Sequence, residues 1–286
     1  MDRFIQTNGI KLHYLDHPGP GPTLILMPGL TANAHSFDGL IEAGLNSSFR
    51  VLAVDLRGRG LSDKPVHGYS MADHAADILG LLEVLDLDRV ILGGHSFGGL
   101  LTIYLAAQHP ERFSRFVVID AAARMHPDTF ELIRPAIERL GKPVASWDEY
   151  LESMMQMPFY QGWWDPMLEN YYRADVETLA NGSVCSLTRP EIIAQAAAAV
   201  MAEDWTKHLA AISKPLLLLN APGPYGPPGT PPVLPRELAL ETVNLVPDGR
   251  YVEIPGNHMT MLFGPGAEKM VAAIKEFAGP EEAAGD

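Results

Sequence analysis

The sequence of 286 residues predicts an α/β fold in which an eight-stranded, mostly parallel sheet carries an inserted helical segment. Short apolar runs typical of strands buried on both faces alternate along the chain with segments of helical spacing, and this alternation indicates a parallel sheet. The alternation stops between residues 124 and 213, where the pattern is helical. With 47% hydrophobic residues, the chain can bury a sizeable core.

An antiparallel hairpin is expected at the start of the chain, followed by six buried parallel strands. Apolar residues alternate with polar ones around Asn8-Gly9, a dipeptide that tolerates the positive φ angles of a tight turn. Residues 72–85 show a helical spacing of apolar positions, and Ser70 with Asp73 at their start resembles a capping box. The six parallel strands are predicted over residues 23–27, 50–54, 89–92, 116–119, 215–219 and 251–254.

The same patterns divide the chain into two parts. Residues 1–123 and 214–286 are predicted to form the sheet core, and residues 124–213 a helical cap, called the cap segment below. No strand is expected in the cap segment, and the tail from Gly279 is expected to fray. The helix start signals of the cap segment are Ser146 with Glu149, Asp165 before Pro166, and Thr188 with Glu191.

Two stretches have an unusual composition. The cap segment holds a dense group of large apolar side chains, which either form its own core or line a substrate pocket beneath it. This group is Trp147, Met154, Met155, Met157, Phe159, Tyr160, Trp163 and Trp164. Residues 221–235 hold so many prolines and glycines that they predict a stiff loop, either an interdomain wall or a functional loop.

Charge and cysteine content exclude several classes of function. Lys and Arg number 21 and Asp and Glu 35, so the formal charge is −14, which disfavours nucleic acid and anionic membranes as partners. A single cysteine, Cys185, cannot form an intrachain disulfide, and the sequence shows neither a secretory signal nor an apolar run of about 20 residues. We therefore expect a cytoplasmic protein that acts on a small molecule, and the sequence leaves a homodimer open.

The stretch Gly94-His95-Ser96-Phe97-Gly98 lies between an apolar strand and a helical segment. A serine in such a turn has a strained backbone that requires small residues two positions to either side, and the turn lifts its hydroxyl above the sheet. The following helix points its positive end at the same place. Ser96 is therefore the predicted nucleophile.

Four stretches together resemble the α/β-hydrolase superfamily, and the resemblance covers nearly the whole chain. They are residues 27–31, residues 54–65, the turn at Ser96, and Pro255-Gly256-Asn257-His258. The resemblance implies a catalytic base at His258, in the loop after the last strand. It does not define the substrate.

The serine hydroxyl needs this base, and the base needs an acid that fixes its tautomer. Most members of the superfamily supply the acid after the seventh strand, but residues 215–236 contain no Asp or Glu. Asp120 ends the sixth strand, where a minority of relatives place the acid, so Asp120 is the predicted acid and Asp248 the alternative. His95 is expected to point away from the nucleophile.

The resemblance also implies an oxyanion hole formed by the backbone amides of Leu30 and Phe97. No zinc-binding pattern or phosphate-binding glycine loop is found in the sequence, so no metal and no cofactor are expected. The residues predicted to bind substrate are Thr31, His35, Arg124, Met125, Met154, Phe159, Tyr160, Trp163, Trp164, Tyr225 and Met259.

Together these residues predict a serine hydrolase that cleaves a small or medium carboxylic ester through an acyl-enzyme on Ser96. The alternative is an amide, enol-lactone or carbon–carbon bond in an acidic ring-cleavage product, because several of the matching stretches also resemble hydrolases of that kind. Arg124 would then bind a substrate carboxylate, unless it is a solvent-exposed arginine. Two further hypotheses are a cofactor-free dioxygenase, with His258 and Asp120 deprotonating an aromatic substrate, and a non-catalytic ligand receptor.

Overall fold

The computed structural model describes residues 1–279, so most of the tail that was expected to fray lies outside the described part. Eight strands form one sheet in the order β1-β2-β4-β3-β5-β6-β9-β10, in which β2 pairs antiparallel with β1 and β4 and the other pairs are parallel. Their bounds are β1 Asp2–Thr7, β2 Ile10–His17, β3 Thr23–Met27, β4 Arg50–Asp55, β5 Val90–His95, β6 Phe113–Ile119, β9 Leu216–Asn220 and β10 Gly249–Glu253. The predicted fold class is confirmed, and the β1–β2 turn has positive φ at both Asn8 and Gly9.

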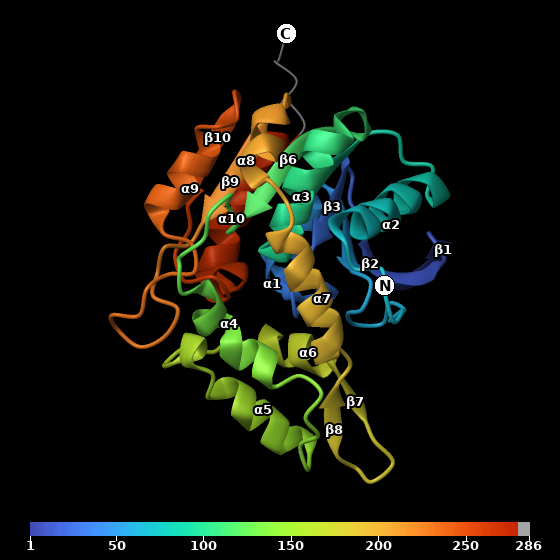
Figure 1. The fold of residues 1–286 in the computed structure, drawn as a ribbon, viewed down its shortest axis with the longest axis vertical. Helices are drawn as coiled ribbons and strands as arrows, with labels where there is room; N and C mark the ends of the chain where they lie inside the picture. Colours follow the sequence, from blue (N-terminus) through green and yellow to red (C-terminus); the bar gives the residue numbers. More distant parts are fainter. Residues whose placement is uncertain (280–286) are drawn as a thin grey trace.

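Helices cover both faces of this sheet (Figure 1). Successive residues of β3 point to opposite faces: Ile25 packs with α2 and α3, whereas Leu26 packs with α1 and α10. The predicted capping box is present, because Ser70 Oγ accepts the Asp73 amide at 3.1 Å and Asp73 accepts the Ser70 amide at 2.9 Å. These helices and the one before β10 are α1 Asp38–Glu42, α2 Met71–Val84, α3 Phe97–Gln108, α9 Arg236–Val243 and α10 Gly264–Ala278.

The cap segment contains five helices and one short hairpin. Figure 1 shows α4, α5, α6 and the hairpin gathered at one end of the molecule, while α7 leads back to α8 beside the sheet. The elements are α4 Thr129–Glu138, α5 Trp147–Met155, α6 Met167–Arg173, β7 Val176–Thr178, β8 Val184–Ser186, α7 Pro190–Met201 and α8 Trp205–Ala211. Within the described residues, no helix is long and apolar enough to cross a membrane.

Two expectations for the cap segment are wrong. Strands β7 and β8 pair antiparallel around Asn181-Gly182, a turn dipeptide of the same kind as Asn8-Gly9, so the segment is not purely helical. Thr188 does not cap α7: its hydroxyl has no hydrogen-bond partner among residues 1–279, and the helix begins with Pro190, whose fixed φ suits a first helical turn. The start signal at Ser146 is confirmed, because its hydroxyl accepts the Glu149 amide at 3.2 Å.

Candidate active site

Ser96 occupies a sharp turn between β5 and α3, with φ of 53° in the left-handed region. Side chains larger than glycine would not fit beside it, since a Cβ at Gly94 would collide with the Gly98 backbone and one at Gly98 with Met27. The Ser96 amide donates to the carbonyl of Ile119 at 2.8 Å, which ties the turn to the end of β6. The half-buried hydroxyl therefore stands at the carboxyl edge of the sheet, where it lines a cavity.

His258 and Asp120 meet at the same edge. His258 lies in the loop between β10 and α10, and its Nδ1 donates to Oδ2 of Asp120 at 2.6 Å. Asp120 is fully buried at the end of β6, with its own φ at 49°. Its second oxygen accepts the Asn220 side-chain amide at 2.9 Å and the Ala221 backbone amide at 2.8 Å. These bonds hold the carboxylate toward the imidazole.

Asp248, the alternative acid, is placed elsewhere. It precedes β10 and so lies at the amino end of that strand, whereas His258 follows the carboxyl end. Its side chain is exposed and lies 3.7 Å from the Arg250 guanidinium. The structure therefore brings Asp120, and not Asp248, to the imidazole.

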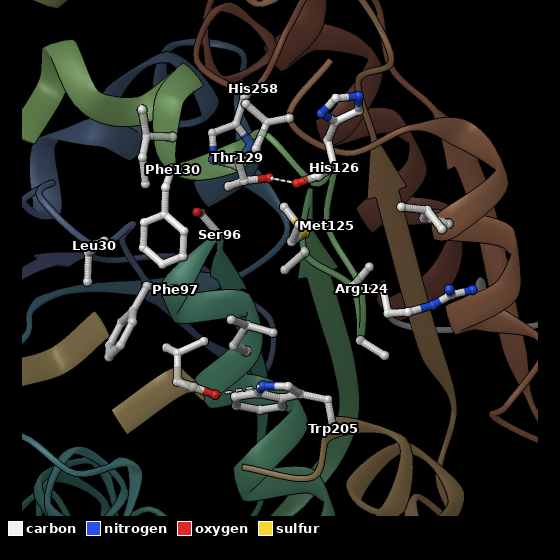
Figure 2. A pocket seen from close by; sticks show the side chains of 18 of the residues that line it. Leu30, Ser96, Phe97, Arg124, Met125, His126, Thr129, Phe130, Trp205 and His258 are labelled. Atoms are coloured by element: carbon white, nitrogen blue, oxygen red, sulfur yellow. Dashed lines mark hydrogen bonds between the residues drawn. The ribbon is translucent and has the colours of Figure 1, made fainter. Parts of the chain in front are cut away.

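The cavity connects His258 with Ser96. With Nδ1 donating to Asp120, the Nε2 atom of His258 is free to accept a proton. Both side chains line the same cavity, and Figure 2 shows them together at one side of it. Within residues 1–279 no hydrogen bond joins Ser96 Oγ to the imidazole, a contact that commonly tightens only when substrate binds.

His95 supports the loop that carries His258, a role that the sequence analysis missed. Its buried ring lies 4.5 Å from the His258 ring, and its Nε2 donates to the His258 carbonyl at 2.8 Å. Burial and the neighbouring His258 lower the pKa of His95 well below its ordinary value, so it remains neutral. As expected, it is not among the residues that line the cavity.

Arg59 supports both predicted oxyanion residues, and it was also missed. It is fully buried, its Nε donates to the Leu30 carbonyl at 3.0 Å, and its guanidinium lies 4.9 Å from the centre of the Phe97 ring. Burial lowers the pKa of Arg59 to about 9. Among the described residues, no carboxylate pairs with it; its Nη1 instead donates to the neutral Nε2 of His74 at 2.9 Å. Leu30 and Phe97 themselves line the cavity.

The cavity at Ser96 has a volume of about 810 Å³, within the range of small-molecule sites. Apolar side chains from α3, α4, α7, α8 and α9 and from the loops after β6 and β9 form most of its wall. They include Leu100, Ala121, Met125, Phe130, Ile133, Ala197, Val200, Trp205, Val233 and Leu238. Of the predicted substrate-binding residues, Arg124 and Met125 are in this wall.

The other predicted substrate-binding residues do not line this cavity: Thr31, His35, Met154, Phe159, Tyr160, Trp163, Trp164, Tyr225 and Met259. The large aromatic rings pack against one another instead. Tyr160 is buried against Phe159, Trp163 and Trp164, and Phe159 stacks at 4.8 Å on Tyr225 of the proline-rich loop. In this structure these aromatic side chains therefore pack mainly against one another, with Trp163 and Trp164 half-buried.

Arg124 lies at the mouth of the cavity as an exposed arginine. Its side chain is 70% exposed and forms an ion pair with Glu241 on α9. Figure 2 shows its guanidinium directed away from Ser96. In residues 1–279, no three His, Cys, Asp or Glu side chains are grouped closely enough to hold a metal ion.

The comparisons with known proteins place the chain in a family. A family model described as "alpha/beta hydrolase fold" matches residues 22–265. The chain therefore belongs to the α/β-hydrolase superfamily.

Individual curated relatives match only part of the chain, at moderate sequence identity. The chain is 33% identical over 136 residues to the 2-(acetamidomethylene)succinate hydrolase of Mesorhizobium japonicum, covering 46% of this chain and 49% of that protein. It is 39% identical over 117 residues to the N-formylmaleamate deformylase of Pseudomonas putida, covering 41% and 43%. The chain thus spans about half the length of these curated relatives. The crystal structure of E-2-(acetamidomethylene)succinate hydrolase is similar with a TM-score of 0.81 at 25% identity, covering 97% of this chain and 98% of that one.

Proposed function

We propose that the protein is a serine hydrolase that forms an acyl-enzyme on Ser96. His258 takes the proton of the attacking hydroxyl and later delivers it to the leaving group. Asp120 fixes the imidazole tautomer and stabilises its protonated form, while the amides of Leu30 and Phe97 receive the developing oxyanion. The observation that carries this proposal is the 2.6 Å contact between Asp120 and His258 beside the cavity that Ser96 lines.

The relatives favour an acyl bond other than a simple ester. The names of both curated relatives contain an amide group, as acetamido and as maleamate. We therefore place amide hydrolysis before the hydrolysis of esters and enol-lactones, which uses the same acyl-enzyme and remains the second candidate. Amide hydrolysis depends more strongly on His258, because the leaving amine must be protonated.

A substrate panel tests the proposal. Esters, lactones, amides and diketones are assayed with the wild type and with Ser96→Ala, and we expect at least one acyl compound to be hydrolysed with a loss of about 10⁶-fold in kcat on substitution. Turnover that survives in Ser96→Ala would refute the nucleophile assignment. Consumption of dissolved oxygen by the enzyme and an aromatic substrate, with no cofactor added, would instead support the dioxygenase hypothesis.

A further inference from the structure

We propose that the part of the substrate held in the Ser96 cavity is apolar and uncharged, so that carboxylates are selected against. This inference rests on the proposed function, because it names the substrate class of the same site. It separates this chain from the two curated relatives, whose names contain succinate and maleamate, both anions at neutral pH.

The wall of the cavity offers few free polar atoms. Carbon atoms of aliphatic and aromatic side chains make up most of it, and two of its polar side chains are already bonded within the protein. Thr129 Oγ1 donates to the His126 carbonyl at 2.6 Å, and Trp205 Nε1 donates to the Val200 carbonyl at 3.0 Å. The walls therefore favour apolar surface, which gains free energy when it leaves water.

The charged side chains of the wall oppose a bound anion. Glu237 and Glu203 are carboxylates, Glu203 accepting from His208 Nε2 at 2.8 Å, and Arg124 already has Glu241 as its partner. His126 accepts the Asp128 amide on Nδ1 at 3.1 Å, and Figure 2 shows its ring turned away from Ser96. Among the described lining residues, no cation is left without a partner carboxylate. The formal charge of −14 adds repulsion at longer range.

A second cation, Arg59, is screened from the cavity. Arg59 lies behind Leu30 and Phe97, which form the wall, and Arg59 itself is not in the wall. A carboxylate in the cavity would lose its water and find no ion-pair partner. We therefore expect anionic ligands to react far more slowly than neutral ones of equal length.

Two matched phosphonates test this inference, because they react with the serine whichever acyl bond the natural substrate contains. The first is methyl nitrophenyl hexylphosphonate, and the second carries a carboxylate at the end of the same chain. In each reaction Ser96 Oγ forms a bond to phosphorus, the bond to nitrophenolate breaks, and the serine proton passes to His258. The readouts are the rate of nitrophenolate release and the mass added to the peptide that contains Ser96.

We expect the neutral reagent to inactivate the wild type at least about 100-fold faster than the carboxylate reagent. Equal rates, or a faster carboxylate reagent, would overturn the inference and leave the proposed function standing. If neither reagent labels Ser96, the proposed function fails and the inference falls with it. The two failures are therefore distinguishable.

A pair of variants checks that the wall causes the selection. Met201 is the last residue of α7, lines the cavity and is 70% exposed; Met155 is the last residue of α5, 43% exposed, and outside the cavity wall. Met201→Arg should raise the rate of the carboxylate reagent relative to that of the neutral reagent about threefold, while Met155→Arg should leave this ratio unchanged. If the relative rate of the carboxylate reagent rose equally in both variants, the selection would come from net charge, and a role for the cavity wall would be contradicted.

Discussion

Two regions of the molecule place their side chains by different means. At the carboxyl edge of the sheet, Ser96 and Asp120 sit at the ends of adjacent strands with positive φ, and the backbone itself aims them. In the cap segment, packing against other rings determines where each large ring lies. Tyr160, for example, packs against Tyr172 and Trp164. A position set by the backbone is fixed by a few neighbouring residues. A position set by packing depends on the whole tertiary structure.

The largest effect is expected at the sheet edge. Asp120→Asn keeps an oxygen for Asn220 and Ala221 but presents an amide to His258, which favours the wrong imidazole tautomer. We expect kcat to fall by about 10⁴-fold with little loss of stability. Steady-state kinetics on the most active compound of the panel measures this.

Asp248→Asn is the matched control, because it makes the same change at an exposed carboxylate at the far end of β10. Its kcat should stay within about twofold, as expected for a surface site. Comparable losses in the two variants would show that the separation of the two carboxylates seen in the structure is irrelevant to catalysis.

An intermediate effect is expected in the cap segment, where Tyr160 is buried outside the cavity wall. Tyr160→Ala should lower the free energy of unfolding by about 3–5 kcal/mol, because it empties a packed aromatic site. Values of kcat and KM measured well below the melting temperature should change by less than about threefold. Urea unfolding together with kinetics gives both quantities.

The opposite pattern is expected for Phe130, which lines the cavity and is 53% exposed. Phe130→Ala should raise KM about fivefold for an apolar substrate, since contact area is lost, and leave stability nearly unchanged. If Tyr160→Ala changed KM and Phe130→Ala did not, the placement of the cavity relative to the aromatic group would be wrong.

The same contrast explains how much the sequence could predict. The turn at Ser96 and the loop of His258 each follow a strand whose apolar run is recognisable, so their meeting at one edge follows from the parallel sheet. Asp120 was recognised because residues 215–236 lack any carboxylate. The β7–β8 hairpin could have been predicted from Asn181-Gly182.

The rest depends on contacts between distant segments. Arg59 acts on Leu30, and His95 on the backbone of His258, through hydrogen bonds that no local pattern records. Most of the cavity wall, Arg124 and Met125 apart, was missed for a related reason: Val200 and Trp205 lie on helices of the cap segment that sequence spacing alone does not place at the cavity. An apolar helix face has the same spacing whether it meets solid core or an open cavity.

The most direct test of the central claim is the site of acylation during turnover. The wild type is mixed with nitrophenyl hexanoate, quenched in acid within milliseconds, digested and analysed by mass spectrometry. We predict a hexanoyl group on the peptide that contains Ser96, with a burst of nitrophenolate equal to the enzyme present. Steady product formation with the hexanoyl group on another side chain, or on none at any quench time, would contradict the account.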